Sequence, residues 1–152
     1  MRRFRKTWEG PRHPWRKEAL IAEIDLIGRY GLKNKRELWK MRTVLRNIRK
    51  RARALLALSQ AEREQEESKL KKLLVRYGLI DENADVSAIL SLTIEDILKR
   101  RLQTILYEKK LASSIYHARQ LITHKKVMVG NLIVSSPSYL VKKEEEENIK
   151  II

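Results

Sequence analysis

The spacing of hydrophobic and polar residues predicts helices up to about residue 124. The clearest pattern is a stripe of apolar residues at steps of three and four, which places them on one face of an α-helix. Asn34 stands where a capping residue is expected, and Glu37 follows at the position of its capping-box partner. The stripe that this helix should bury consists of Leu38, Met41, Leu45, Ile48, Ala52 and Leu55.

Weaker patterns flank this helix on both sides. Before it, a helix is expected over residues 15–30, ended by Gly31, and its buried face should hold Leu20, Ile24 and Ile27. After it, residues 60–76 carry opposite charges four positions apart, such as Glu67 and Lys71, which is typical of a solvent-exposed helix. Gly78 should end that helix, and residues 81–86 indicate a polar loop.

Two further helices are expected before the pattern changes. Thr93 and Asp96 favour a capped start for a helix over residues 94–109. Ser114 favours a capped start for a helix over residues 115–124. The residues that these helices should bury are Ile97, Leu98, Leu102, Ile105 and Leu106 in the first, and Ile115, Ala118, Leu121 and Ile122 in the second.

Beyond residue 126 the pattern alternates with a period of two, as in a β-strand. Val127 and Val129 flank Met128, and Gly130-Asn131 permits the positive φ angles of a tight hairpin turn before residues 132–134 return. Short strands are also expected at residues 139–141 and 149–151, and the acidic run 144–147 is expected to be solvated.

These patterns predict an α+β fold with three parts. Residues 1–14 form a basic N-terminal arm, residues 15–98 an all-helical domain, and residues 99–152 a small domain with helices packed on a short antiparallel sheet. In the arm, Pro14 disfavours helix at His13. The aromatic residues Phe4, Trp8 and Trp15 either stack on nucleic-acid bases or pack against the following helices, and both interpretations stay open.

Net charge varies sharply along the chain. The formal net charge is +15, and residues 1–58 carry +13, residues 59–98 carry −4, residues 99–143 carry +9 and residues 144–152 carry −3. Neutralising phosphates releases condensed counterions, so cationic surfaces of this kind favour a nucleic acid. Two cationic segments on either side of an acidic one therefore indicate two contact surfaces for one long polyanion.

Composition excludes several classes of function. The chain has no cysteine, so disulfides and thiolate metal sites are excluded, and His117 and His124 lack a third ligand for a metal. We find no Gly-rich nucleotide loop and no paired catalytic acids, so we expect no enzyme, no cofactor and no small-molecule substrate. No apolar run approaches the ~20 residues of a membrane span. The N-terminus lacks the hydrophobic region of a secretory signal, which makes a cytoplasmic location the expectation.

A stripe of arginines runs beside the apolar face of the helix that follows Asn34. Each arginine follows an apolar residue by one position, which is about 100° around the helix. A solvated face usually mixes both signs of charge, whereas Glu37 is the only acid in residues 36–58. We interpret the stripe as a phosphate-binding surface, with an ordinary solvated face as the alternative. It consists of Arg42, Arg46, Arg49 and Arg53.

Arg119 is the strongest candidate for a phosphate contact in the second cationic segment. It lies on the expected helix over residues 115–124, and its planar guanidinium matches two phosphate oxygens at a time. The alternative for Arg119 is a buried salt bridge that holds the domain together.

The stretch from residue 101 to residue 141 resembles the S-four RNA-binding domain. That family shows an Arg-Leu helix start, a capped helix containing Ala-Arg-Gln followed by a hydrophobic residue and Ile, and a hairpin closed by Pro-Ser-Tyr. The matching residues here are Arg101-Leu102, Ser114, Ala118-Arg119-Gln120-Leu121-Ile122, Val127, Val129 and Pro137-Ser138-Tyr139. Lys110 and Lys125 depart from the pattern, because the family usually has glycine there. Both positions should need a left-handed backbone, where a residue with a side chain costs roughly 1 kcal/mol.

The resemblance extends over nearly the whole chain. Residues 7–15 (TWEGPRHPW) and 30–39 (YGLKNKRELW) are similar to the N-terminal half of the small-subunit ribosomal protein S-four family in its archaeal form. Bacterial members often carry a cysteine-rich zinc knuckle, which this chain cannot form. The resemblance implies a primary rRNA-binding protein that nucleates assembly of the 5′ domain of the small subunit. It also implies a place near the messenger entry, an influence on translational accuracy and ribosomal protein S-five as a neighbour.

The RNA contacts predicted from these arguments fall in three groups. The arm contributes Arg2, Arg3, Arg5, Lys6 and Arg12, and the arginine stripe is joined by Lys50. The third group, in the S-four region, consists of Arg100, Arg101, Lys109, Lys110, Ser114, His117, Arg119, Gln120, His124, Lys125 and Lys126.

Other functions share some of these features. S-four domains accompany catalytic domains in pseudouridine synthases and tyrosyl-tRNA synthetases, but those domains need more chain than remains here. A ribosome-biogenesis factor on the same scaffold, bound only to precursor rRNA, is the closest alternative. A membrane-surface role for the basic helix is the weakest.

Overall fold

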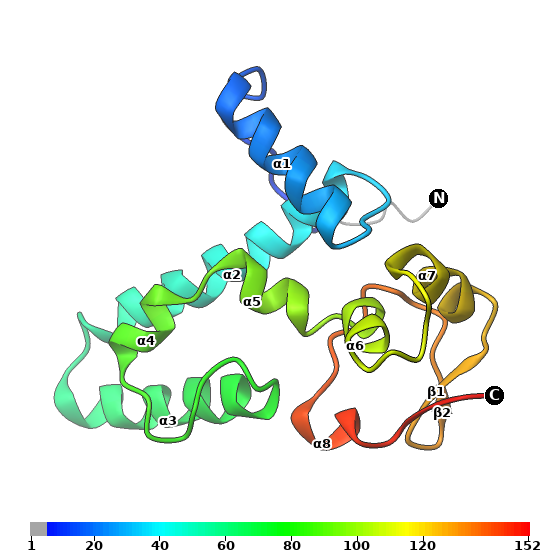
Figure 1. The fold of residues 1–152 in the computed structure, drawn as a ribbon. Coiled ribbons are helices and arrows are strands. Elements are labelled where there is room, and N and C mark those ends of the chain that lie inside the picture. The colour runs from blue at the N-terminus through cyan, green and yellow to red at the C-terminus, as the bar shows by residue number, and fades with distance from the viewer. Residues whose placement is uncertain (1–5) are drawn as a thin grey trace, which may run out of the picture.

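The computed structural model describes residues 6–152 and divides them into a helical unit and a smaller α+β unit (Figure 1), which confirms the predicted fold class. The helical unit consists of α1 (Lys17–Arg29), α2 (Lys35–Leu55), α3 (Gln60–Arg76), α4 (Val86–Ser91) and α5 (Ile94–Lys99). The second unit consists of α6 (Leu102–Glu108), α7 (Ile115–Thr123), β1 (Val127–Val129), β2 (Leu132–Ile133), α8 (Lys143–Glu146) and β3 (Ile149–Ile151).

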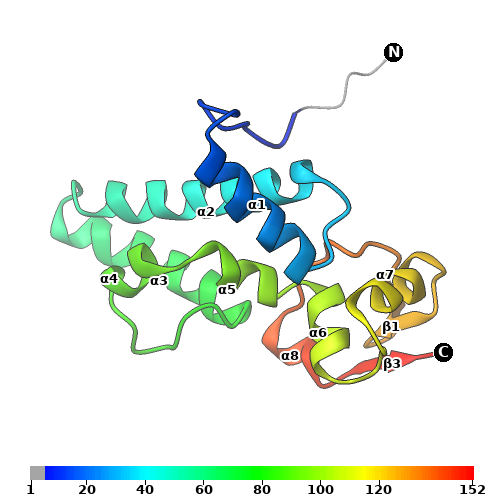
Figure 2. The same ribbon diagram turned by 45° about the horizontal axis from the view of Figure 1, so that its top comes forward.

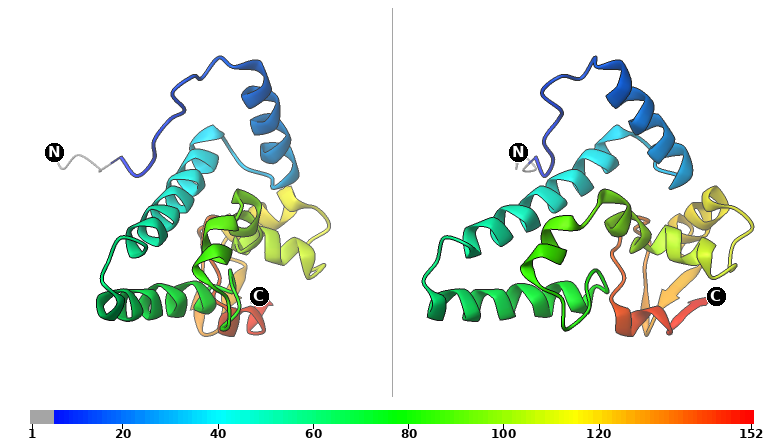
Figure 3. Two further views of the ribbon diagram at one scale, coloured as in Figure 1. Left: turned by 90° about the vertical axis from the view of Figure 1, so that its left-hand side faces the viewer. Right: turned by 60° about the vertical axis from the view of Figure 1, so that its left-hand side comes forward.

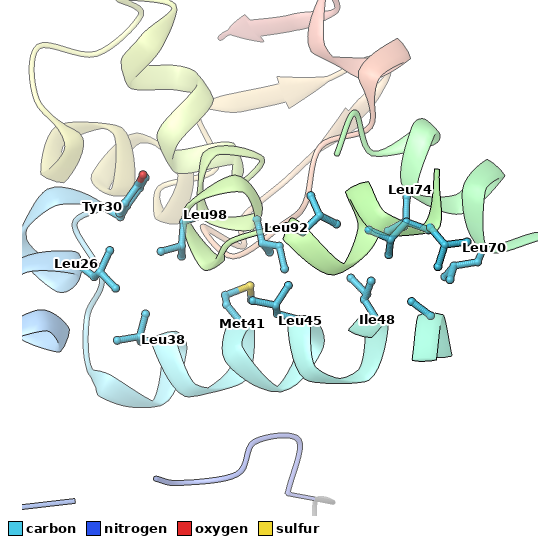
Figure 4. Close-up of a cluster of buried hydrophobic side chains, with 14 of the residues drawn as sticks. Leu26, Tyr30, Leu38, Met41, Leu45, Ile48, Leu70, Leu74, Leu92 and Leu98 are labelled. Atoms are coloured by element: carbon cyan, nitrogen blue, oxygen red, sulfur yellow. The ribbon is translucent and has the colours of Figure 1, made fainter. Parts of the chain in front are cut away.

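Helix α2 is the centre of the helical unit, and Figure 2 shows it lying over α3, α4 and α5. All six residues of its predicted apolar stripe are buried, and Figure 4 shows several of them facing side chains from the neighbouring helices. The Asn34 side chain accepts a hydrogen bond from the Glu37 N–H at 3.2 Å, which confirms the predicted cap. The Glu37 side chain does not accept the return hydrogen bond from the Asn34 N–H that would complete a capping box. Its carboxylate instead accepts from Arg101 and Arg119 of the second unit.

Helix α1 buries only part of the face that the sequence predicts. It begins at Lys17, and it buries Glu23 and Leu26. Ile27 packs against the core as expected, whereas Ile24 is 63% exposed. Helix α2 presents three donors to the buried Glu23 carboxylate, and these contacts hold that side of α1 against α2. The donors are the side chains of Lys35, Trp39 and Arg42.

Helix α3 has the predicted bounds, and the expected Glu67–Lys71 pair is present at 2.9 Å. The short helix α4 was not predicted. It follows the polar loop and packs on α2, with Val86 and Ile89 buried. A six-residue helix is too short to show a clear period, so the sequence gives little signal for it.

The single helix expected over residues 94–109 is broken in two, so that part of the prediction is wrong. Its start is correct, because the Asp96 carboxylate accepts from the backbone N–H and the hydroxyl of Thr93. At Arg101 the backbone becomes extended and forms a β-bridge with Leu140. The chain that returns from the hairpin therefore supplies hydrogen bonds that a continuous helix would have made internally.

Four helices end in the same way, with a left-handed residue followed by the two backbone hydrogen bonds of a Schellman motif. In α1 and α3 that residue is glycine, Gly31 and Gly78. In α6 and α7 it is Lys110 and Lys125, with φ of 57° and 59°. The prediction that these two lysines hold left-handed backbone is confirmed.

The sheet of the second unit has the strand order β2-β1-β3 and is antiparallel throughout. The predicted hairpin and the strand at residues 149–151 are both present. The strand expected at residues 139–141 is reduced to the single bridge at Leu140. Most of the acidic run lies in α8, which buries no residue, and Glu144 and Glu147 are exposed as expected. The run is nevertheless tied to the fold, because Glu146 pairs with Arg100 and Glu145 accepts from Tyr139.

The units have separate hydrophobic cores. The core of the helical unit is built from buried residues between Leu26 and Leu98, and that of the second unit from residues between Leu102 and Ile149. The chain passes from one core to the other through Lys99, Arg100 and Arg101. Figure 3 shows the segment before α1 returning alongside α2, opposite the second unit.

Candidate nucleic-acid interface

Part of the arginine stripe of α2 is free to meet a ligand. Arg53 and Lys50 are exposed, and neither takes part in an ion pair among the described residues. Arg46 is also exposed and pairs with Glu9 of the N-terminal segment. An exposed pair of this kind contributes little to stability, so a phosphate can replace the carboxylate at small cost.

The other two arginines of the stripe are tied into the fold. Arg42 is half-buried and pairs with the buried Glu23. The Nη2 of Arg49 donates to the carbonyl of Leu92 at 2.6 Å, which fixes the approach of α4 to α2. For these two residues the structure favours an anchoring role over the predicted phosphate contact.

The stripe nevertheless forms one concave surface with the start of α5. The hollow has a volume of about 470 Å³. Its walls carry guanidinium groups on one side and the first turn of α5 on the other. The lining residues are Arg42, Leu45, Arg46, Arg49, Arg53, Thr93 and Ile94.

The N-terminal segment lies against the same helix. The Trp8 ring packs on Trp39 with centroids 5.2 Å apart, and the Lys6 ammonium sits 4.3 Å from the Trp8 centroid. Trp8 therefore packs against a helix, whereas Trp15 is 87% exposed. Lys6 and Arg12 are exposed. The remaining predicted contacts of the arm, Arg2, Arg3 and Arg5, lie outside the described residues.

A second exposed cationic surface lies at the C-terminal end of α7 and the start of the hairpin. Gln120, His124, Lys125 and Lys126 are exposed there, and Lys110 is exposed at the end of α6. Lys110 and Lys125 stand at the left-handed turns that end the two helices. A hollow of about 240 Å³ lies among them, lined by His117, Gln120, Leu121, His124 and Lys126.

Ser114 and His117 are joined in the cap of α7. The Ser114 hydroxyl accepts from the His117 N–H at 3.1 Å, so the predicted cap is confirmed. The His117 ring is exposed, and its Nδ1 lies 3.0 Å from the Ser113 hydroxyl. Ser114 thus serves the helix, and only its remaining hydrogen-bonding capacity is left for RNA.

Arg100 and Lys109 hold α8 in place. Arg100 pairs with the Glu146 carboxylate at 2.7 Å and donates to the carbonyl of Val141 at 3.2 Å. Lys109 donates to the Glu146 carbonyl. Both side chains contact Glu146 in this structure, and Lys109 is exposed, so RNA contact by these two residues stays a prediction.

The two units meet at a cluster of one carboxylate and two guanidiniums, which we call the Glu37 clamp. Arg101 donates to Glu37 at 2.8 Å, and Arg119 donates to its other oxygen at 2.7 Å. Arg101 is 0% exposed and paired with Glu37, so its side chain is not accessible to RNA in this structure. The Arg119 side chain is 21% exposed, and its pairing matches the alternative that the sequence left open, a salt bridge.

The contacts around the clamp are close. Gln103 is buried, and its amide donates to the carbonyls of Gly31 and Ile115, both at 3.0 Å. Arg119 donates further to the Gly31 carbonyl and to Gln103. A Cβ on Gly31 would lie 2.8 Å from the Gln103 amide nitrogen, so glycine is needed here for space as well as for its φ of +56°.

The electrostatics of the clamp favour the carboxylate form of Glu37. Burial raises the pKa of the Glu37 carboxyl, but hydrogen bonds from Arg119 and Arg101 outweigh it, and the net pKa lies below the ordinary value. Burial lowers the pKa of Arg101, and the contact with Glu37 opposes that change.

Sequence reasoning missed the clamp, although one signal pointed to it. Glu37 is a lone acid in a strongly basic stretch, and it was assigned to a cap rather than to a partner far along the chain. No sequence signal indicated that Gln103 and Glu23 are buried, because a polar residue is expected to face solvent until its partners are known.

The described residues contain neither a group of side chains that could hold a metal ion nor a helix that could span a membrane. Within residues 6–152 no three acidic or histidine side chains come together in a way that could hold a metal ion. No helix in that range is long and apolar enough to cross a membrane.

Comparison with known proteins gives consistent matches. The S4 domain family matches residues 100–147. The Small ribosomal subunit protein uS4 of Ignicoccus hospitalis is 54% identical over 148 residues, covering 97% of this chain and 89% of that protein. The proteins of the same name from Hyperthermus butylicus and Saccharolobus solfataricus are 54% and 50% identical, covering 94% and 97% of this chain and 81% and 82% of their own length.

Proposed function

The chain belongs to the uS4 family of small ribosomal subunit proteins, a structural constituent of the subunit rather than an enzyme, and from this premise we propose how it binds ribosomal RNA. The observation that carries the proposal is the pair of exposed cationic surfaces, one on α2 and one at the end of α7. Each presents exposed cations, and among the described residues only Arg46 of the two surfaces is paired with an acid, the exposed Glu9.

The first surface binds RNA through the exposed part of the arginine stripe. Arg46, Lys50 and Arg53 supply direct contacts, while Arg42 and Arg49 hold the helix in place and line the hollow. Lys6 and Arg12 extend this surface, since the N-terminal segment packs on α2 through Trp8.

The second surface binds RNA through the left-handed turns and the exposed side of α7. Lys110, Lys125 and Lys126 supply charge, and Gln120 and His124 supply hydrogen bonds at the rim of the smaller hollow. Because phosphate contacts position a protein while polar side chains can read base edges, we assign specificity to this second surface.

Family membership further supports three specific roles. We propose that the partner RNA is the 5′ domain of the small-subunit rRNA, that binding there nucleates assembly, and that the protein influences translational accuracy beside ribosomal protein S-five. The relatives are named as constituents of the subunit, which favours this function over a biogenesis factor bound only to precursors.

Chemical footprinting on a full-length archaeal small-subunit rRNA tests the proposal. Protection should fall in the 5′ domain. Affinity for a 5′-domain transcript should drop roughly a thousandfold between 50 and 200 mM monovalent salt, as expected for about six phosphate contacts. Binding no tighter than to an unrelated tRNA, or a flat salt response, would contradict it.

A further inference from the structure

The joint between the two units combines apolar packing with a cluster of charges. The buried cores end at Leu98 and begin again at Leu102, and Leu140 of the second unit packs against the helical core. The Glu37 clamp also crosses the joint, because an acid at the start of α2 meets one arginine before α6 and another on α7. The two cationic surfaces lie on elements that this one carboxylate joins.

The geometry of the clamp fixes orientation as well as distance. Arg119 donates to both oxygens of the Glu37 carboxylate and to the Gly31 carbonyl, and Arg101 donates to one of the two oxygens. Planar groups that share several hydrogen bonds resist rotation better than a single ion pair does. The close approach at Gly31, where no Cβ fits, leaves little room for the units to slide.

Stability alone is a poor explanation for this arrangement. A buried ion cluster seldom repays the desolvation of its charges, and apolar residues of similar volume commonly hold a fold as well or better. In the Glu37 clamp, the Nε and Nη1 atoms of Arg101 are buried without a hydrogen-bond partner. Ion clusters of this kind are retained in some proteins because they specify one geometry.

We infer that Glu37, with Arg101 and Arg119, is a positioning site for RNA binding: the clamp holds the α2 surface and the α7 surface at a fixed separation so that one RNA engages both. This inference rests on the proposed function and deepens it. A second contact made within a rigid protein has a high effective concentration, which a loose joint would lower. The clamp therefore acts on affinity without touching RNA.

Glu37→Gln is an informative test, because the loss of a negative charge and the loss of the clamp predict opposite changes in RNA affinity. The substitution removes a negative charge, so simple attraction between protein and phosphate predicts tighter binding to a 5′-domain transcript. Loss of the clamp predicts binding weaker by at least about tenfold, because the two surfaces no longer act together. Glu64→Gln is the matched control, since Glu64 is exposed on α3 and has no ion-pair partner among the described residues. It should leave affinity equal or slightly tighter.

A six-nucleotide oligouridylate, short enough to occupy one surface, separates positioning from folding. Glu37→Gln should weaken binding of the transcript and leave binding of the short oligonucleotide at the wild-type value. Gly31→Ala should act in the same direction without changing any charge, because its methyl group would push Gln103 and Ile115 away. Gly78→Ala is its control, with a similar positive φ of +64° but nearest contacts of 3.5 Å.

All measurements are made at a temperature where circular dichroism shows each variant folded. If Glu37→Gln is folded and binds the transcript as tightly as wild type or more tightly, the positioning role is overturned. An equal loss for transcript and oligonucleotide would also overturn it, since that result describes a damaged surface rather than a loosened joint. If wild type itself fails to prefer the transcript over tRNA, the proposed function fails and not this inference alone.

Discussion

Lys125 is the position at which backbone strain and RNA contact can be separated by two substitutions. Lys125→Gly and Lys125→Ala both remove the cation, but only glycine relieves the left-handed backbone at φ 59°. A residue with a Cβ costs about 1–2 kcal/mol in that conformation. Glycine loses about 0.5–1 kcal/mol more in entropy on folding. We therefore expect the glycine variant to be as stable as wild type or up to about 1.5 kcal/mol more stable.

The alanine variant should be about 1 kcal/mol less stable than the glycine variant, because it keeps the strain. For a chain of this size that difference corresponds to roughly 2–4 °C in Tm. Urea unfolding and thermal unfolding at neutral pH measure it. The two hydrogen bonds of the Schellman motif, from Lys125 to Ile122 and from Lys126 to Leu121, are backbone bonds that both variants keep.

Affinity for RNA should respond to the charge alone. Both variants should bind a 5′-domain transcript more weakly than wild type, by the same factor, with a salt slope smaller by about one. Equal stability of the alanine and glycine variants would show that the strain in the turn does not exceed the entropy that glycine loses on folding. Wild-type affinity in both variants across several salt concentrations would show that Lys125 makes no phosphate contact.

Two further predictions concern the clamp and the stripe. The folded-state pKa of Glu37 lies below its ordinary value near 4.5, so its contribution to stability is present at neutral pH and is lost as pH falls through the folded-state pKa. The Tm should therefore fall less steeply between pH 7 and pH 3 in Glu37→Gln than in wild type. In the stripe, the double variant Arg46→Ala and Arg53→Ala should weaken RNA binding while the free energy of unfolding falls by less than about 1 kcal/mol. Arg49→Ala should instead lower the free energy of unfolding by about 1–2 kcal/mol, because it leaves the Leu92 carbonyl unpaired. A destabilised double variant with intact affinity would reverse these assignments.

Periodic and capped elements were predictable from the sequence because their determinants are local. The apolar stripe of α2 repeats over five turns and is buried in full, and the hydrogen bond to the Asn34 side chain forms as expected. The left-handed turns at Lys110 and Lys125 were also predictable, since the resemblance places glycine at both positions. In each case the residues that decide the structure lie within a few positions of one another.

Elements whose geometry depends on distant partners were not predictable in this way. The sequence of residues 94–109 has a continuous helical period, yet the returning strand pairs with Arg101 and breaks it. Helix α1 likewise leaves its apolar Ile24 exposed, while donors on α2 hold Glu23 inside. Local patterns give no information on such contacts, which form only when the chain folds back on itself.

The same limit applies to the candidate RNA site, and it changes how the net charge should be interpreted. Arg100 and Arg119 lie in the most cationic segment, but their acids are 46 and 82 positions away along the chain. Counting charges by segment assigns all ten basic residues of residues 99–143 to one surface, whereas the structure uses Arg100, Arg101, Lys109 and Arg119 to hold the fold together. Lys110, Lys125 and Lys126 remain exposed, and they take part in no ion pair among the described residues. The salt dependence of RNA binding should therefore follow these exposed residues and not the formal charge of +15.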